Sequence, residues 1–147
     1  MAYEFKAVRR VEFSDTDMAG IMHFSNFFKF METAEHGFFR SLGLSIIQDR
    51  AHPGIGWPRV RAECVYKSPL HFQDEVEIHL LVSEKKSKSL SYIFIFRKMG
   101  EPEGPEVARG SITVVCVSHA PGVKMKACAI PPGVADQISV APAEALK

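Results

Sequence analysis

The residues best suited to chemistry stand together in residues 13–28, FSDTDMAGIMHFSNFF. Asp15 and Asp17 precede Gly20 in a turn-like run, and a helical pattern begins near Ser25. The free N–H groups and the positive dipole end at a helix start can bind an oxygen that gains negative charge. A carboxylate a few residues upstream can serve as base or nucleophile, so the stretch suits attack on an acyl carbonyl. A purely structural role is the alternative, because Asp favours turns.

A long amphipathic helix is predicted to follow this turn. Its apolar residues recur at intervals of three and four, the spacing of one helix face. They are Phe27, Phe30 or Met31, Ala34, Phe38 and Leu42. The pattern predicts about 18 mostly buried residues, with Ser25 or Asn26 as N-cap and Gly43 just after the last turn. The less buried side is predicted to carry Glu32, Glu35, His36 and Arg40.

Five segments show the alternation of half-buried strands. They are residues 3–13, 59–67, 75–82, 90–98 and 107–118. In the second segment, Ala62, Cys64 and Tyr66 alternate with a charged face that includes Arg59 and Arg61. The short connections between the last four segments favour antiparallel neighbours, because a parallel crossover needs about a dozen residues or more. Residues 50–59, rich in Pro and Gly, are predicted to form a loop.

One helix and five antiparallel strands predict a two-layer α+β fold. Two of the strand patterns, YIFIF and ITVVCV, are apolar on both faces, and a second subunit is the expected cover for the outer face. Residues 1–147 are expected to form one domain. Residues 119–147 are a C-terminal extension, with one short helical turn in PPGVADQI and a flexible tail.

The composition is that of an ordinary globular protein, 46% hydrophobic and 24% charged with a net charge of +1. No global field therefore favours nucleic acid or an anionic membrane as a partner. Three cysteines without a CxxC motif predict reduced thiols. The chain has no signal-like N-terminus and no long apolar run, so we expect a cytoplasmic protein that does not span a membrane. No histidine has zinc-site spacing, so no metal is predicted.

The stretch DTDMAGIMHFSNFFKFMETAE resembles the signature of the 4-hydroxybenzoyl-CoA thioesterase-like branch of the hotdog superfamily. In that signature D-x-D-x-x-G precedes two apolar residues, an aromatic or His pair, and Asn followed by an aromatic. The resemblance continues through RAECVYKSPLHFQDEVEI, with its Tyr-x-x-Pro and the following Asp, and covers residues 3–118. It implies the hotdog fold, a five-stranded antiparallel sheet wrapped around one long central helix, with the strands in the order first, third, fourth, fifth, second. It also implies homodimers, often dimers of dimers, with active sites at the subunit interface.

The resemblance implies roles for four residues of the opening stretch. Asp17 matches the catalytic carboxylate, which acts as nucleophile or as general base on water. The backbone N–H of Phe24 matches the amide that polarises the thioester carbonyl. Asn26 matches a recurring motif residue that holds the loop or contacts the substrate. His23 stands one place before the position of a histidine in some relatives, and it is a candidate to assist Asp17, with a structural role as the alternative.

Further residues are candidates for substrate binding. Coenzyme A carries phosphates, and a near-neutral chain must meet them with a local basic cluster. Such a cluster is present in a predicted hairpin turn, at Lys85, Lys86 and Lys88, although a charged hairpin tip has the same composition. Phe27 and Trp57 can line an acyl or aryl pocket, and both are equally suited to the core.

These observations together predict an acyl-CoA thioesterase, which hydrolyses an acyl- or aryl-CoA thioester to a carboxylic acid and free CoA. No cofactor is expected, because a thioester is already activated and water is the second substrate. The alternatives are a non-catalytic acyl-CoA-binding hotdog module, a hotdog dehydratase, or a thioesterase that acts on acyl carrier protein. The hydratase-type pattern Y-x-x-x-H-x-D-x-x-F is absent from the sequence.

Overall fold

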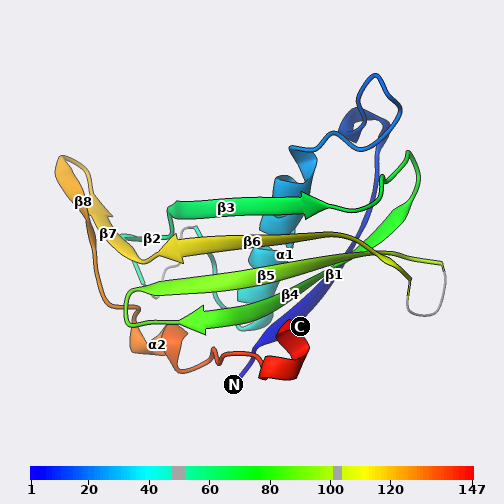
Figure 1. Ribbon diagram of the computed structural model, residues 1–147. Coiled ribbons are helices and arrows are strands. Elements are labelled where there is room, and N and C mark those ends of the chain that lie inside the picture. The colour runs from blue at the N-terminus through cyan, green and yellow to red at the C-terminus, as the bar shows by residue number, and fades with distance from the viewer. Residues whose placement is uncertain (48–51, 101–103) are drawn as a thin grey trace.

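A five-stranded antiparallel sheet forms the body of the protein (Figure 1). The computed structural model describes residues 1–47, 52–100 and 104–147. The strands lie in the order β1-β4-β5-β6-β3, which along the chain is first, third, fourth, fifth, second. Their bounds are β1 Glu4–Arg10, β3 Arg59–Tyr66, β4 Glu75–Lys85, β5 Ser89–Lys98 and β6 Glu106–Val115. The predicted α+β hotdog architecture is confirmed.

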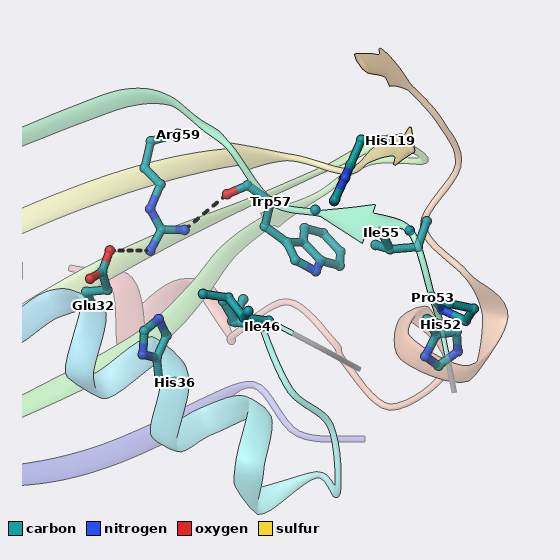
Figure 2. A pocket seen from close by; sticks show the side chains of 12 residues that line it. Glu32, His36, Ile46, His52, Pro53, Ile55, Trp57, Arg59 and His119 are labelled. Carbon is teal, nitrogen blue, oxygen red and sulfur yellow. Dashed lines mark hydrogen bonds and ion pairs between the residues drawn. The ribbon is translucent and has the colours of Figure 1, made fainter. Parts of the chain in front are cut away.

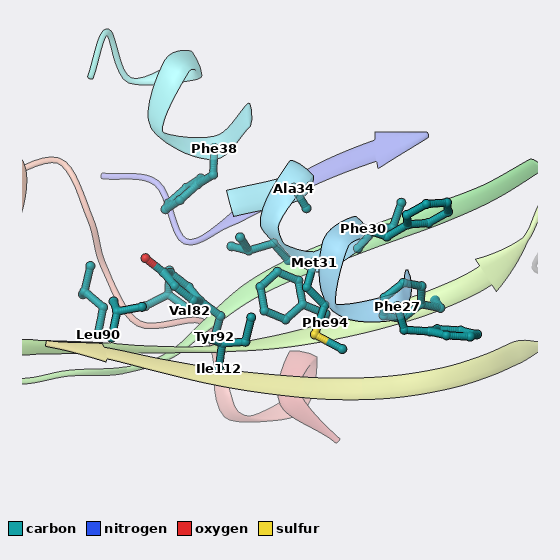
Figure 3. Packing of buried hydrophobic residues seen from close by; sticks show 14 of the residues in the cluster. Phe27, Phe30, Met31, Ala34, Phe38, Val82, Leu90, Tyr92, Phe94 and Ile112 are labelled. Atoms are coloured by element: carbon teal, nitrogen blue, oxygen red, sulfur yellow. The ribbon is translucent and has the colours of Figure 1, made fainter. Parts of the chain in front are cut away.

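Helix α1, Asn26–Ser41, crosses one face of this sheet and packs mainly against β1 and β4. Its 16 residues agree with the predicted length. The side chains that it buries include Phe27, Phe30, Met31, Ala34 and Phe38. Figure 3 shows these residues facing Tyr92 and Phe94 of β5 and Ile112 of β6. Burial of each large apolar side chain contributes about 1.5–3 kcal/mol, so this face holds the helix on the sheet.

The helix ends where its sequence predicts. Gly43 has a φ of 74°, in the left-handed region that favours glycine after a helix. Its N–H donates to the carbonyl of Arg40 at 3.0 Å, and the N–H of Leu44 donates to that of Phe39 at 2.9 Å. These two bonds satisfy carbonyl groups that the last turn leaves free.

The prediction for Glu35 was wrong, because its side chain is fully buried. The carboxylate of Glu35 forms an ion pair with the guanidinium of Arg59, with Oε1 and Nη2 2.5 Å apart. Arg59 had been predicted on the same strand face as Arg61. A register shift between these two residues in the pairing of β3 with β6 places Arg59 on the helix side instead.

A second, three-stranded sheet, in the order β2-β7-β8, was not predicted. It consists of β2 Ile55–Gly56, β7 Val117–Ala120 and β8 Val123–Ala127. Strand β2 lies in the predicted loop, whose residues 50 and 51 are outside the described residues, and has only two residues, too few for a periodic signal. The predicted strand 107–118 divides between β6 and β7. Residues 101–103 of the predicted β5–β6 connection are also outside the described residues.

The C-terminal segment packs on the main sheet. Helix α2, Pro132–Ala135, confirms the predicted helical turn. The 3-10 helix η2, Ala143–Leu146, places Ala145 and Leu146 against Leu81 and Ile95. Part of the outer apolar face that was expected to need a second subunit is therefore covered by the chain itself. None of the helices among the described residues is long and apolar enough to cross a membrane.

Candidate active site

Asp17 lies in the turn between the 3-10 helix η1, Phe13–Asp15, and α1. Its N–H donates to the carbonyl of Ile21 at 2.9 Å, and its carbonyl accepts from the N–H of Gly20 at 3.0 Å. Gly20 has a φ of 82°, which lets the chain reverse at this point. Oδ1 of Asp17 accepts from the N–H of Ala19 at 2.8 Å. Oδ2 accepts no hydrogen bond from the described residues, so one carboxylate oxygen is held and the other is available.

A cavity of about 480 Å³ opens beside Asp17, between the start of α1 and the end of β3. Its walls are Asp17, Ile21, Met22, Phe24, Phe27, Tyr66, Lys67, Ser68 and Pro69. The ring of Phe27 meets the rings of Tyr66 and Phe96 edge-on, at centroid distances of 5.0 and 5.2 Å. The cavity therefore joins an apolar, largely aromatic wall to a single carboxylate, as binding sites for small organic ligands do.

The N–H of Phe24 lies two residues before the start of α1. It shares a planar trans peptide with the carbonyl of His23, which accepts from the N–H of Asn26 at 3.0 Å. Because the two groups of a trans peptide point in opposite directions, the Phe24 N–H points away from the helix. No described residue accepts a hydrogen bond from it. The positive end of the helix dipole adds to its affinity for an oxygen that gains negative charge.

Asn26 and His23 brace this turn, and neither lines the cavity. The side-chain amide of Asn26 and the backbone N–H of His23 both donate to the carbonyl of Asp15, each at 2.8 Å. Nδ1 of His23 lies 2.8 Å from the hydroxyl of Ser25, and the imidazole stacks on the ring of Phe24 at 4.6 Å. The predicted loop-holding contact of Asn26 is therefore present in the structure.

Tyr66 at the end of β3 and Lys67 directly after it also line the cavity, and neither was predicted as a catalytic residue. The hydroxyl of Tyr66 donates to the carbonyl of Phe24 at 2.9 Å. Burial, with a smaller contribution from Cys64, raises the pKa of Tyr66 to about 12, so the hydroxyl keeps its proton at neutral pH. Lys67 forms an ion pair with Glu106. In the sequence Tyr66 resembles any other strand residue, and its one signal was the Tyr-x-x-Pro motif.

Trp57 lies in a second cavity, of about 840 Å³, toward the other end of α1 (Figure 2). Phe27 lines the Asp17 cavity, and His36 lines this second cavity. The two residues are nine positions apart on α1, a distance of about 13 Å along the helix axis. Trp57 itself packs edge-on against Phe39 at 5.6 Å. The carboxylate of Glu32 in this cavity is paired with Arg59 at 3.2 Å. Trp57 therefore lies apart from Asp17 within one chain.

The three hairpin lysines also lie away from Asp17. Lys85 pairs with Leu90 across the β4–β5 hairpin, which lies at the Arg59 end of the sheet. Tyr66 is seven residues, or about 23 Å, from Arg59 along β3.

The side chains of these three lysines differ in their contacts with the described residues. The ammonium of Lys85 donates to the carbonyls of Ala135 and Ile138 at 2.8 and 2.7 Å. Lys86 lies 3.5 Å from Glu84 on the exposed surface, and Lys88 is exposed. A role of Lys86 and Lys88 in binding CoA phosphates stays a prediction.

The fold and the cavity together are typical of an enzyme that hydrolyses activated acyl groups. A carboxylate and a free helix-start amide at one apolar cavity are the parts needed for hydrolysis of an activated acyl group. Among the described residues, no group of three or more His, Cys, Asp or Glu side chains could hold a metal ion. Residues 11–138 match the model of the thioesterase-like superfamily, and the chain belongs to this family of thioester hydrolases.

Three relatives illustrate the match. A gentisyl-coenzyme A thioesterase of known structure is 35% identical, with a TM-score of 0.75 over 88% of this chain and 98% of that one. A 1,4-dihydroxy-2-naphthoyl-CoA hydrolase of Prochlorococcus marinus (strain NATL1A) is 26% identical over 103 residues, 65% of this chain and 69% of the relative. A mutant 4-hydroxybenzoyl-CoA thioesterase in complex with 4-hydroxybenzoyl-CoA, 22% identical, shares the fold with a TM-score of 0.83 over 94% and 100% of the two chains. The predicted family and the predicted thioester hydrolase class are confirmed.

Proposed function

We propose that the protein hydrolyses an aryl- or acyl-CoA thioester to the carboxylic acid and free CoA at the Asp17 cavity. The observation that carries the proposal is that one aromatic cavity is lined by Asp17 and by Phe24, whose N–H donates to none of the described residues. The rings of Phe24, Phe27 and Tyr66 favour a flat aryl group in this cavity. The relatives named for gentisyl-CoA and 1,4-dihydroxy-2-naphthoyl-CoA add support for an aromatic acyl group.

The reaction needs a base or nucleophile and a donor for the oxyanion. As general base, Asp17 takes a proton from water while the water oxygen bonds to the thioester carbon. The Phe24 N–H binds the carbonyl oxygen as it gains charge. The C–S bond then breaks, and CoA leaves as a thiolate that takes up a proton. As nucleophile, the Asp17 carboxylate instead forms a mixed anhydride, which water hydrolyses to the same products.

A thiol-release assay over short, long and aromatic acyl-CoAs tests this proposal, with Asp17→Asn beside wild type. Asn keeps an oxygen for the Ala19 N–H, so the variant should fold normally. We expect kcat to fall by about 10²–10⁴-fold, because the base or nucleophile is lost. Full activity of Asp17→Asn would refute the mechanism. Binding of acyl-CoA without thiol release by wild type would identify a non-catalytic module instead.

His23→Gln is the matched comparison for the assisting role of His23. Nδ1 of His23 is already engaged with Ser25, so we expect a loss of less than about tenfold in kcat. A loss equal to that of Asp17→Asn would instead make His23 a catalytic residue.

We also propose a homodimer, paired further into a dimer of dimers. Strand β3 is an edge of the main sheet, and its Val60 and Val65 are 61% and 64% exposed. An edge strand with exposed apolar side chains can add a strand from a second copy. Light scattering on purified protein should give two or four times the chain mass, and a monomer would contradict the proposal.

A further inference from the structure

Tyr66 links the end of β3 to the start of α1, across 42 positions of sequence. We propose that Tyr66 is a positioning residue, whose hydroxyl holds the Phe24 carbonyl so that the Phe24 N–H faces the carbonyl oxygen of the bound thioester. The inference rests on the proposed function, in which that N–H stabilises the oxyanion.

Hydrogen bonds fix Phe24 from both sides. The peptide before it is held through the carbonyl of His23, which accepts from the N–H of Asn26 at 3.0 Å. The peptide after it is held through its own carbonyl, which accepts from the hydroxyl of Tyr66 at 2.9 Å. Because each peptide is planar, the first bond orients the Phe24 N–H, which belongs to the same peptide as the His23 carbonyl. The second bond holds the next peptide, and so restrains the rotation of Phe24 relative to it.

Asn26 and His23 brace the turn before Phe24, since both donate to the carbonyl of Asp15. The Phe24 side chain is 62% exposed, and its ring stacks on the imidazole of His23 at 4.6 Å. The N-cap residue Ser25 makes no side-chain cap hydrogen bond to the helix. Tyr66 is 42% exposed, and its ring meets the buried Phe27 edge-on at 5.0 Å. The hydroxyl is thus a point of attachment that the sheet provides to the helix start.

Kinetics of Tyr66→Phe give the first test. The substitution removes the hydroxyl and keeps the ring that contacts Phe27. We expect kcat to fall by about tenfold with KM nearly unchanged, because a displaced donor weakens binding of the transition state more than of the substrate. The loss should be constant from about pH 6 to about pH 9, since the raised pKa keeps the hydroxyl protonated there. Tyr3→Phe removes a hydroxyl far from the cavity walls, and it should leave kcat unchanged.

The carbonyl stretch of bound substrate gives the second test, which a merely structural role would not affect. The reference protein, called the parent, is the Asp17→Asn variant, which we expect to bind benzoyl-CoA without rapid hydrolysis; the substrate is labelled with ¹³C at its thioester carbonyl. Binding to the parent should lower the infrared frequency of this carbonyl, and adding Tyr66→Phe should move the band back toward its value in free benzoyl-CoA.

The outcomes separate the two proposals. Wild-type kcat in Tyr66→Phe, or a reduced kcat with the carbonyl band unchanged from the parent, would overturn the positioning role and leave the proposed function intact. A parent whose carbonyl band does not shift on binding would overturn the oxyanion role of Phe24 itself, and the role of Tyr66 with it.

Discussion

Glu35 in the middle of α1 and Arg59 at the start of β3 form an ion pair in which the Glu35 side chain is only 1% exposed. The guanidinium contacts both carboxylate oxygens, with Nη2–Oε1 at 2.5 Å and Nη1–Oε2 at 3.2 Å. Helix α1 packs mainly on β1 and β4, and this pair joins it to β3 together with the ion pair of Glu32 with the same Arg59. The same strand carries Tyr66 at its other end. The pair therefore helps to hold the strand on which the site depends.

Arg59→Met should destabilise the fold by about 3–5 kcal/mol, because it leaves a buried carboxylate without its partner. The double variant Glu35→Met/Arg59→Met should recover most of this loss, since it removes both charges. Urea denaturation measures both free energies of unfolding. Arg61→Met is the control, because its side chain is 70% exposed and its ion pair lies on the surface. If Arg59→Met unfolds at the same urea concentration as Arg61→Met, the pair has no such role.

The pH dependence of stability should show the titration of Glu35. Burial raises the pKa of Glu35, and the nearby Arg59 opposes this rise without cancelling it. Between the ordinary pKa of about 4.3 and the raised value, the folded state keeps a proton that the unfolded chain has released. The contribution of Glu35 to stability is therefore largest below this window and declines as pH rises through it. The stability difference between wild type and Glu35→Gln should fall over this range, and a difference that rises with pH would contradict the assignment.

Gly20→Ala should cost about 1–2 kcal/mol, because the turn at Asp17 requires a left-handed conformation. A Cβ atom at this position meets no atom within 4 Å, so the cost of Ala comes from the backbone alone. Gly20→Asn should cost less, since Asn tolerates this conformation better than Ala does. Thermal unfolding compares the two variants. Equal losses for Ala and Asn would point to a cause other than backbone strain.

The hairpin lysines should separate into a structural and a ligand-binding group. Lys85→Met removes two hydrogen bonds to carbonyls of the C-terminal segment, and should lower stability by about 1–3 kcal/mol while KM stays unchanged. The double variant Lys86→Gln/Lys88→Gln should raise KM for an acyl-CoA. It should leave KM unchanged for the matching acyl-pantetheine, which lacks the nucleotide phosphates. An unchanged KM for acyl-CoA in this double variant would exclude the predicted phosphate contact.

The sequence by itself determined the features that depend on neighbouring residues. The helix face from Phe27 to Phe38 and the strand alternations follow from side-chain periods of 3.6 and 2. The turn at Asp17 follows from Asp and Gly, whose preferences are local. The motif around Asp17 also carried the correct family.

Only the tertiary structure decided which distant residues meet. Glu35 and Arg59 are 24 positions apart, and their contact depends on a register shift that no periodic pattern reveals. The Tyr66 hydroxyl reaches Phe24, and the Lys85 ammonium reaches Ala135, by the way the sheet lies against the helices. Where such a contact is buried, as at Glu35, folding removes a polar group from water and must give it a partner. That partner is set by the packing of whole elements, which residue spacing alone does not encode.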